Sequence, residues 1–145
     1  MANAMACNHS DRLAAIVDIA GGNYGKLSLC HPSQPINVLE VWGTKDVTYF
    51  GNHILGKPIV GAVKTIQYWA ALDGCALLPK INPIKIDIDS KQPGAETTVL
   101  DYPQCKDSSQ VEMWRIAGAE HQPDFSSRFD DLLIQFLLSH PQINR

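Results

Sequence analysis

The sequence predicts an α/β domain built on a mostly parallel sheet, and three short apolar runs are the basis for that prediction. Each run is rich in Val, Ile and Leu and is followed closely by a glycine. This composition is typical of strands that are buried on both faces of a parallel sheet. Other apolar residues repeat at helical spacing. The three runs are Leu13–Ile19, Ile36–Trp42 and Val111–Ile116.

Length and composition fit a single globular domain. The chain has 145 residues, of which 45% are hydrophobic and 19% are charged. Its net charge of −3 gives no electrostatic reason to expect nucleic acid or an anionic membrane as a partner. No apolar run approaches the roughly 20 residues of a transmembrane helix. The first ten residues, MANAMACNHS, have neither the basic start nor the apolar core of a signal peptide.

Helices are expected in three places. Met1–Asn8 has the Ala and Met content of a helix, and Val60–Ala70 carries apolar residues at helical spacing with Gly74 as a stop. The last helix is the clearest, because its apolar stripe is typical of a face packed on a core, and Pro141 marks its end. The stripe consists of Phe125, Phe129, Leu132, Leu133, Phe136 and Leu137.

The segments between these elements read mostly as irregular. The stretch from Asp46 to about Pro58 is expected to be irregular, and residues 76–94 contain three prolines and the alternating segment Ile84–Ile88. Thr97–Leu100 has the composition of a strand. It is separated from Val111–Ile116 by a turn-like segment, so the two strands are expected to pair as a hairpin.

Four cysteines, Cys7, Cys30, Cys75 and Cys105, form an even set without C-x-x-C spacing. Zinc is therefore not expected. Four cysteines allow three pairings, and the residues alone do not choose among them. Disulfides in an oxidising compartment and four buried free thiols both remain open on this evidence.

Two chemically useful side chains follow two of the predicted strands. Asp46 comes after Ile36–Trp42 and Gly43, and His121 comes after Val111–Ile116. Functional groups of open α/β sheets gather at the carboxyl ends of their strands. An acid followed by a histidine is two thirds of a Ser-His-Asp triad. A serine in the motif G-x-S-x-G does not occur in these 145 residues.

These residues also allow other roles. Asp46 could cap its own turn, and His121 could be an ordinary loop residue. A metal site made by Asp46, His53 and His121 lacks paired-ligand spacing, so no metal and no cofactor are expected. Ser108 and Ser109 have no glycines around them and are poor candidates for a nucleophile, because nothing holds them on a strained turn.

Short motifs also follow one another along nearly the whole chain. They are Ala6-Cys7 with Ala20-Gly21-Gly22, Cys30 with Gly43-Thr44-x-Asp46, Trp69 with Gly74-Cys75 and Cys105, and Gly118-x-x-His121 with Pro123. In this order and spacing they resemble the C-terminal half of an α/β-hydrolase. More narrowly, they resemble the polyhydroxybutyrate depolymerase-like and feruloyl esterase-like esterases.

The resemblance implies a fold and a disulfide pattern. Residues 1–145 would form one partial α/β-hydrolase domain with the last three, mostly parallel strands and their flanking helices, without the N-terminal half that holds the nucleophile elbow. Met1–Asn8 would be the remnant of the helix behind the nucleophile. The cysteines would pair as Cys7–Cys30 and Cys75–Cys105, and the parent family is extracellular or periplasmic.

The resemblance also implies a function, that of a serine carboxylic-ester hydrolase acting on a polyester or an aryl or acyl ester. This chain would supply Asp46 as triad acid and His121 as base, with side chains roughly 2.6–3.2 Å apart. Without the nucleophile it would be inactive by itself. The alternative is a non-catalytic α/β module that binds a ligand or partner in the same strand-end cleft. If the N-terminal half is missing, Leu13–Ile19 would be an exposed edge through which the chain could associate with itself.

Overall fold

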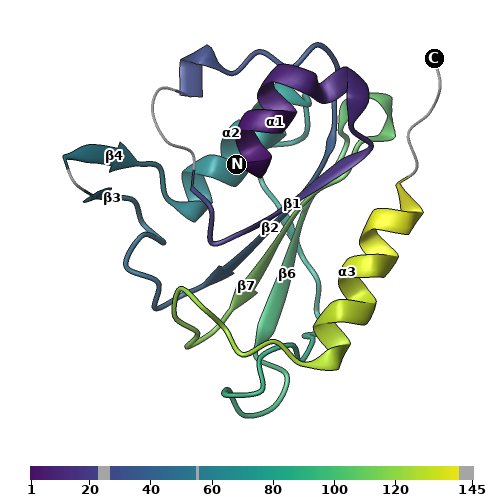
Figure 1. The fold of residues 1–145 in the computed structure, drawn as a ribbon. Helices are drawn as coiled ribbons and strands as arrows, with labels where there is room; N and C mark the ends of the chain where they lie inside the picture. The colour runs from purple at the N-terminus through teal and green to yellow at the C-terminus, as the bar shows by residue number, and fades with distance from the viewer. Residues whose placement is uncertain (23–26, 55, 141–145) are drawn as a thin grey trace.

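The computed structural model describes residues 1–22, 27–54 and 56–140 and shows a three-layer α/β fold (Figure 1). The helices are α1 (Ala2–His9), α2 (Ala62–Leu72) and α3 (Ser127–Ser139), with short 3₁₀ turns at Ser10–Arg12, Leu27–Leu29 and Lys106–Ser108. The strands are β1 (Ala15–Ile19), β2 (Asn37–Gly43), β3 (Asn52–Ile54), β4 (Lys57–Ile59), β5 (Lys80–Ile81), β6 (Thr97–Tyr102) and β7 (Val111–Ile116).

The central sheet has the strand order β1-β2-β7-β6-β5. The three predicted apolar runs form its neighbouring strands β1, β2 and β7, which are parallel to one another. The α/β prediction is therefore confirmed, with strand ends displaced by at most two residues. Strand β6 pairs with β7 in antiparallel fashion, as expected for the hairpin, and β5 adds a further antiparallel strand.

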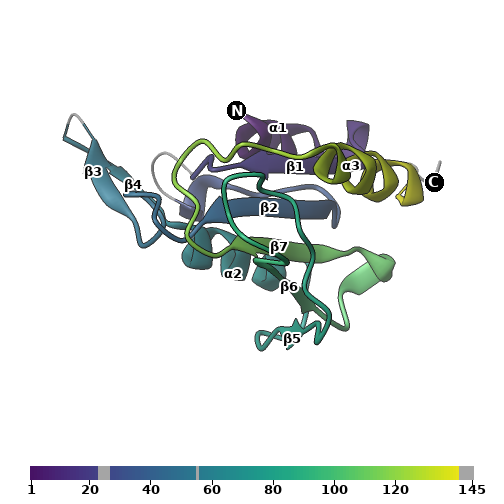
Figure 2. The same cartoon turned by 90° about the horizontal axis from the view of Figure 1, so that it is seen from below.

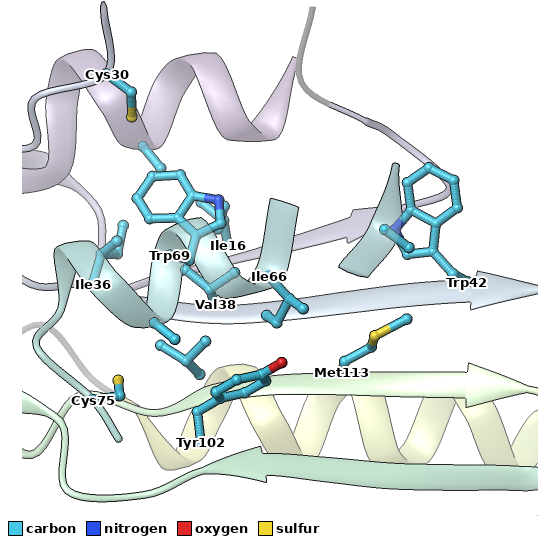
Figure 3. Close-up of a cluster of buried hydrophobic side chains, with 14 of the residues drawn as sticks. Ile16, Cys30, Ile36, Val38, Trp42, Ile66, Trp69, Cys75, Tyr102 and Met113 are labelled. Atoms are coloured by element: carbon cyan, nitrogen blue, oxygen red, sulfur yellow. The ribbon is translucent and has the colours of Figure 1, made fainter. Parts of the chain in front are cut away.

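Helices cover both faces of the sheet (Figures 1 and 2). Alternate residues of β2 point to opposite sides, as strand geometry requires. Val38 and Trp42 belong to the cluster that packs with α1 and α2, around the fully buried Trp69 (Figure 3). Leu39 and Val41 belong to the cluster that packs with α3. Both faces of β2 are thus shielded from solvent, which explains its continuous apolar sequence.

Three details differ from the expectation. The stretch read as irregular before Pro58 contains the β3–β4 hairpin. Helix α3 begins at Ser127, so Phe125 precedes it. Leu137, expected in the core, is 41% exposed, because Phe136 makes the contact with the sheet and the next residue lies about 100° further around the helix. The stop expected at Pro141 lies outside the described residues.

Two disulfides join elements that are distant in the sequence. Cys7 of α1 is bonded to Cys30, and Cys75, which follows α2, is bonded to Cys105 between β6 and β7. This is the pairing that the resemblance implied. Within the described ranges, no helix has the length and apolar character needed to cross a membrane.

The unpaired outer side of β1 leads us to expect that copies of this chain associate with one another. Strand β1 ends the sheet, and among the described residues no strand pairs with its other side. Its free backbone groups form a template for another chain, and Ile19 on it is 41% exposed. We expect concentration-dependent association in sedimentation experiments and a shift toward monomer in Ile19→Lys. Leu78→Lys, at a residue that is 84% exposed and lies outside β1, is the control and should not shift the equilibrium.

Candidate active site

The candidate site lies beyond the carboxyl ends of the parallel strands β2 and β7. Because the two strands are parallel neighbours, the segments that follow Gly43 and Ile116 leave the sheet at the same edge. Both views show the segment after β2 and the segment after β7 side by side (Figures 1 and 2). Asp46 lies in the first segment and His121 in the second.

Asp46 and His121 are in direct contact. The His121 Nδ1 lies 2.8 Å from the Asp46 Oδ2, within the expected range. A carboxylate can only accept, so Nδ1 carries the hydrogen and donates it, which leaves Nε2 of the neutral ring with a free lone pair. The Asp46 side chain is fully buried, whereas the His121 side chain is 60% exposed. The acid is thus shielded and the imidazole is presented to solvent.

Thr48 holds the other oxygen of Asp46. The backbone N–H and the hydroxyl of Thr48 both donate to Asp46 Oδ1, each at 2.7 Å. Burial by itself would raise the pKa of Asp46, but the hydrogen bonds from Thr48 and His121 outweigh it and hold this pKa below its ordinary value of 3.8. The ionised form therefore stabilises the fold above pH 3.8. That contribution is lost as the pH falls through the lowered native pKa.

Backbone hydrogen bonds join the two segments to each other. Thr44 N donates to Ile116 O at 3.0 Å, and Lys45 N donates to Ala119 O at 2.8 Å. In the opposite direction, Gly118 N donates to the hydroxyl of Thr44 at 2.9 Å. These bonds fix the position of each segment relative to the other, so the Asp46–His121 contact is supported by backbone rather than by side chains alone.

The first turn of α1 is anchored at the same edge. Asn3 Nδ2 donates to the Asp18 carboxylate near the end of β1 and to Gly21 O, the latter at 3.0 Å. Beyond the end of β1, Ala20 N donates to Val41 O at 2.9 Å. Helix α1 therefore begins close to the strand ends that carry the candidate site.

Other polar residues considered from the sequence lie elsewhere. His53 is exposed on the β3–β4 hairpin. Ser108 and Ser109 precede β7 and lie at the opposite edge of the sheet from His121. Over residues 1–22, 27–54 and 56–140, no group of three His, Cys, Asp or Glu side chains could hold a metal ion.

An open polar hollow of about 440 Å³ lies at the start of α3. Neither Asp46 nor His121 lines it, so their contact is separate from this hollow. Its lining is Asp87, Ser90, Gln92, Ser126, Ser127 and Arg128.

The sequence reading missed the residues that support Asp46. Thr48 is the most important, since it fixes one carboxylate oxygen through two bonds. The spacing Asp-x-Thr is a known local signal, because an Asp side chain commonly accepts from the backbone two residues on. The role of Thr44 had no such signal, because its partner Gly118 is 74 residues away.

A scan against protein-family models gives no match for this chain, and a comparison with curated proteins gives none either.

Proposed function

We propose that this chain carries the acid and the base of a serine carboxylic-ester hydrolase of the α/β-hydrolase type. The observation that carries the proposal is the 2.8 Å contact between buried Asp46 and exposed His121. The two residues follow adjacent parallel strands, in the chain order that the hydrolase triad has. The substrate class is a carboxylic ester, either a polyester or an aryl or acyl ester.

In this mechanism Asp46 fixes the imidazole through Nδ1–H and stabilises the imidazolium that forms during the reaction. His121 Nε2 takes the proton of the attacking serine and later gives it to the leaving alcohol. The exposure of His121 suits this role, because the proton has to pass to groups outside the described site. The nucleophile and the oxyanion donors would come from outside these 145 residues, and the first turn of α1 lies at the edge where they would be needed.

The two disulfides support an oxidising compartment. Such bonds persist in secreted and periplasmic proteins and are rare in a reducing cytosol. We therefore place the working protein outside the cytoplasm, in agreement with the proposed family.

The experiment uses a fluorophosphonate probe, which labels activated serines. The 145-residue chain should remain unlabelled, and a chain extended upstream through a G-x-S-x-G motif should be labelled. In that longer chain His121→Ala should abolish labelling, because the serine loses its base. Asp46→Asn should lower kcat by about 10⁴-fold, because the imidazole loses its correct tautomer.

His53→Ala is the matched control, since His53 is an exposed histidine on the β3–β4 hairpin. It should leave labelling unchanged. Stoichiometric labelling of the 145-residue chain would contradict the proposal, and so would full labelling of the extended His121→Ala variant.

A further inference from the structure

Two acidic side chains are buried next to each other on the edge strand β1 and its neighbour β2. Asp18 on β1 and Glu40 on β2 are register partners in a parallel pair, so their side chains project from the same face. Asp18 is 7% exposed and Glu40 is completely buried. Neither takes part in the contact between Asp46 and His121. A second function for them has to be sought in their own surroundings.

Neutral side chains surround the two carboxyl groups. Asn3 donates to Asp18, and Trp42 Nε1 donates to Glu40 Oε2 at 3.0 Å. Trp69 Nε1 in turn donates to Asn3 Oδ1 at 2.5 Å. Figure 3 shows Trp42 near the end of β2 and Trp69 extending from α2 toward α1. The second oxygen of Glu40, Oε1, is buried and has no hydrogen-bond partner of normal geometry among the described residues, although the Asn3 amide also acts to lower the pKa of Glu40.

The charges around the pair do not balance two carboxylates. In the 145-residue chain the amine of Met1 is a positive group that acts on Asp18, and the charge of Asp18 acts on Glu40. From helix α2, the neutral indole of Trp69 reaches the pair through Asn3. A buried charge without a partner normally takes up or loses a proton, because desolvation penalises the ionised form heavily. Two adjacent carboxylates add mutual repulsion to that cost.

We propose that Asp18 and Glu40 together carry one proton at neutral pH, and that this singly protonated pair keeps the first turn of α1 on the sheet through Asn3. The proton resides on Glu40, because its Oε1 accepts no hydrogen bond from the part of the chain that the structure describes. Asp18 remains the charged acceptor of the Asn3 amide. Loss of the proton at alkaline pH places a second charge in the cluster and loosens α1. The protonation state of the pair therefore controls how firmly α1 is attached to the sheet.

The pKa values agree with this assignment. Burial raises the pKa of Asp18 to about 6, with the Met1 amine acting in the opposite direction. Burial, followed by the charge of Asp18, raises the pKa of Glu40 well above its ordinary value of 4.5. Groups with raised native pKa values stabilise the fold at low pH. That stability is lost as the pH rises through the native values.

The first test is the pH dependence of unfolding. For Asp18 alone, a rise from 3.8 to about 6 corresponds to an about 100-fold fall in the folding equilibrium constant as pH rises through that interval. Glu40→Gln mimics the neutral acid, so it should be more stable than the wild type at alkaline pH and should show a weaker pH dependence. Glu112→Gln is the control, because this half-buried carboxyl on β7 also has a raised pKa but lies outside the pair.

The second test follows the cluster directly. Infrared difference spectra at neutral pH should contain a protonated carboxyl band that survives in Glu112→Gln and disappears in Glu40→Gln. Tryptophan fluorescence and the amide protection factors in α1, which are corrected for the intrinsic pH dependence of exchange, should change together at alkaline pH in the wild type, because Trp42 bonds to Glu40 and Trp69 bonds to Asn3. Neither should change in Glu40→Gln.

Two results would overturn the proposal. One is a neutral-pH spectrum whose carboxyl band is the same in wild type and Glu40→Gln. The other is that the amide protection factors in α1 stay unchanged at alkaline pH in the wild type. If Glu40→Gln fails to fold, Asp18→Asn serves as the second variant. It removes one charge of the pair and should reduce the alkaline loss of stability in the same way.

Discussion

Removal of the two disulfides is expected to unfold this domain under conditions in which the oxidised protein is native. The linked cysteines are 23 and 30 residues apart. In the chain-entropy model, loops of this length correspond to about 3–4 kcal/mol of stability each. Loss of both therefore removes about 7 kcal/mol, which is comparable with the whole stability of a typical domain, about 5–15 kcal/mol.

The two bonds should not be equivalent in their local effects. Cys7–Cys30 holds α1, an eight-residue helix that would not be stable by itself. The Cys75–Cys105 connection is supported by further backbone bonds, including Ala76 N to Pro103 O at 2.8 Å. Cys7→Ser/Cys30→Ser should therefore raise amide exchange in α1 more than Cys75→Ser/Cys105→Ser does.

Urea denaturation with and without reductant, followed by mass mapping of the oxidised protein, measures this prediction. The single-bridge variants show the contribution of each bond. A denaturation midpoint that does not depend on reductant would contradict the expected stabilisation. Four free thiols, or a Cys30–Cys75 link, would contradict the pairing itself.

Substitution of Gly43 is expected to separate Asp46 from His121. Gly43 ends β2, and a Cβ there would lie closer to the carbonyl oxygens of Ala119 and Glu120 than real Cβ atoms approach other atoms. Because the obstacle is backbone, the histidine segment itself has to move. Gly43→Ala should cost about 1–3 kcal/mol, as overpacking of a tight contact does. The Nδ1–H resonance of His121 should then exchange with water much faster.

Gly94→Ala is the matched control for that experiment. Its backbone has a positive φ of 70°, so Ala is strained there, but a Cβ would meet no atom within 4 Å. It should lower stability without altering the exchange of the His121 ring proton. A Gly43→Ala structure with the Asp46–His121 distance unchanged would show that the two segments adapt more easily than their backbone bonds indicate.

Much of the fold could be read from local patterns in the chain. Strand β7 was predicted to the residue, and β1 and β2 to within two residues, because a strand buried on both faces needs a continuous apolar run. The β3–β4 hairpin and the two-residue strand β5 were not predicted. Both are short and mostly exposed, so their sequences carry no periodic apolar pattern.

Only part of the candidate site could be predicted from local patterns in the sequence. Asp46 and His121 were found because each follows a predicted strand, and parallel neighbours end at one edge. The sequence alone determined which side chains are delivered to that edge and in what chain order. The catalytic roles of the two residues remain a proposal.

The tertiary structure decided the distances between the site residues and the groups with which each of them makes contact. It set the 2.8 Å contact between Asp46 and His121, and it placed the backbone of Ala119 against Gly43. It also decided that Asp18 and Glu40 face each other, since a register shift of one residue would turn one of them to the opposite face. The physical reason is that these contacts join segments up to 76 residues apart, and their energy depends on strand pairing and burial, which no local stretch of sequence encodes.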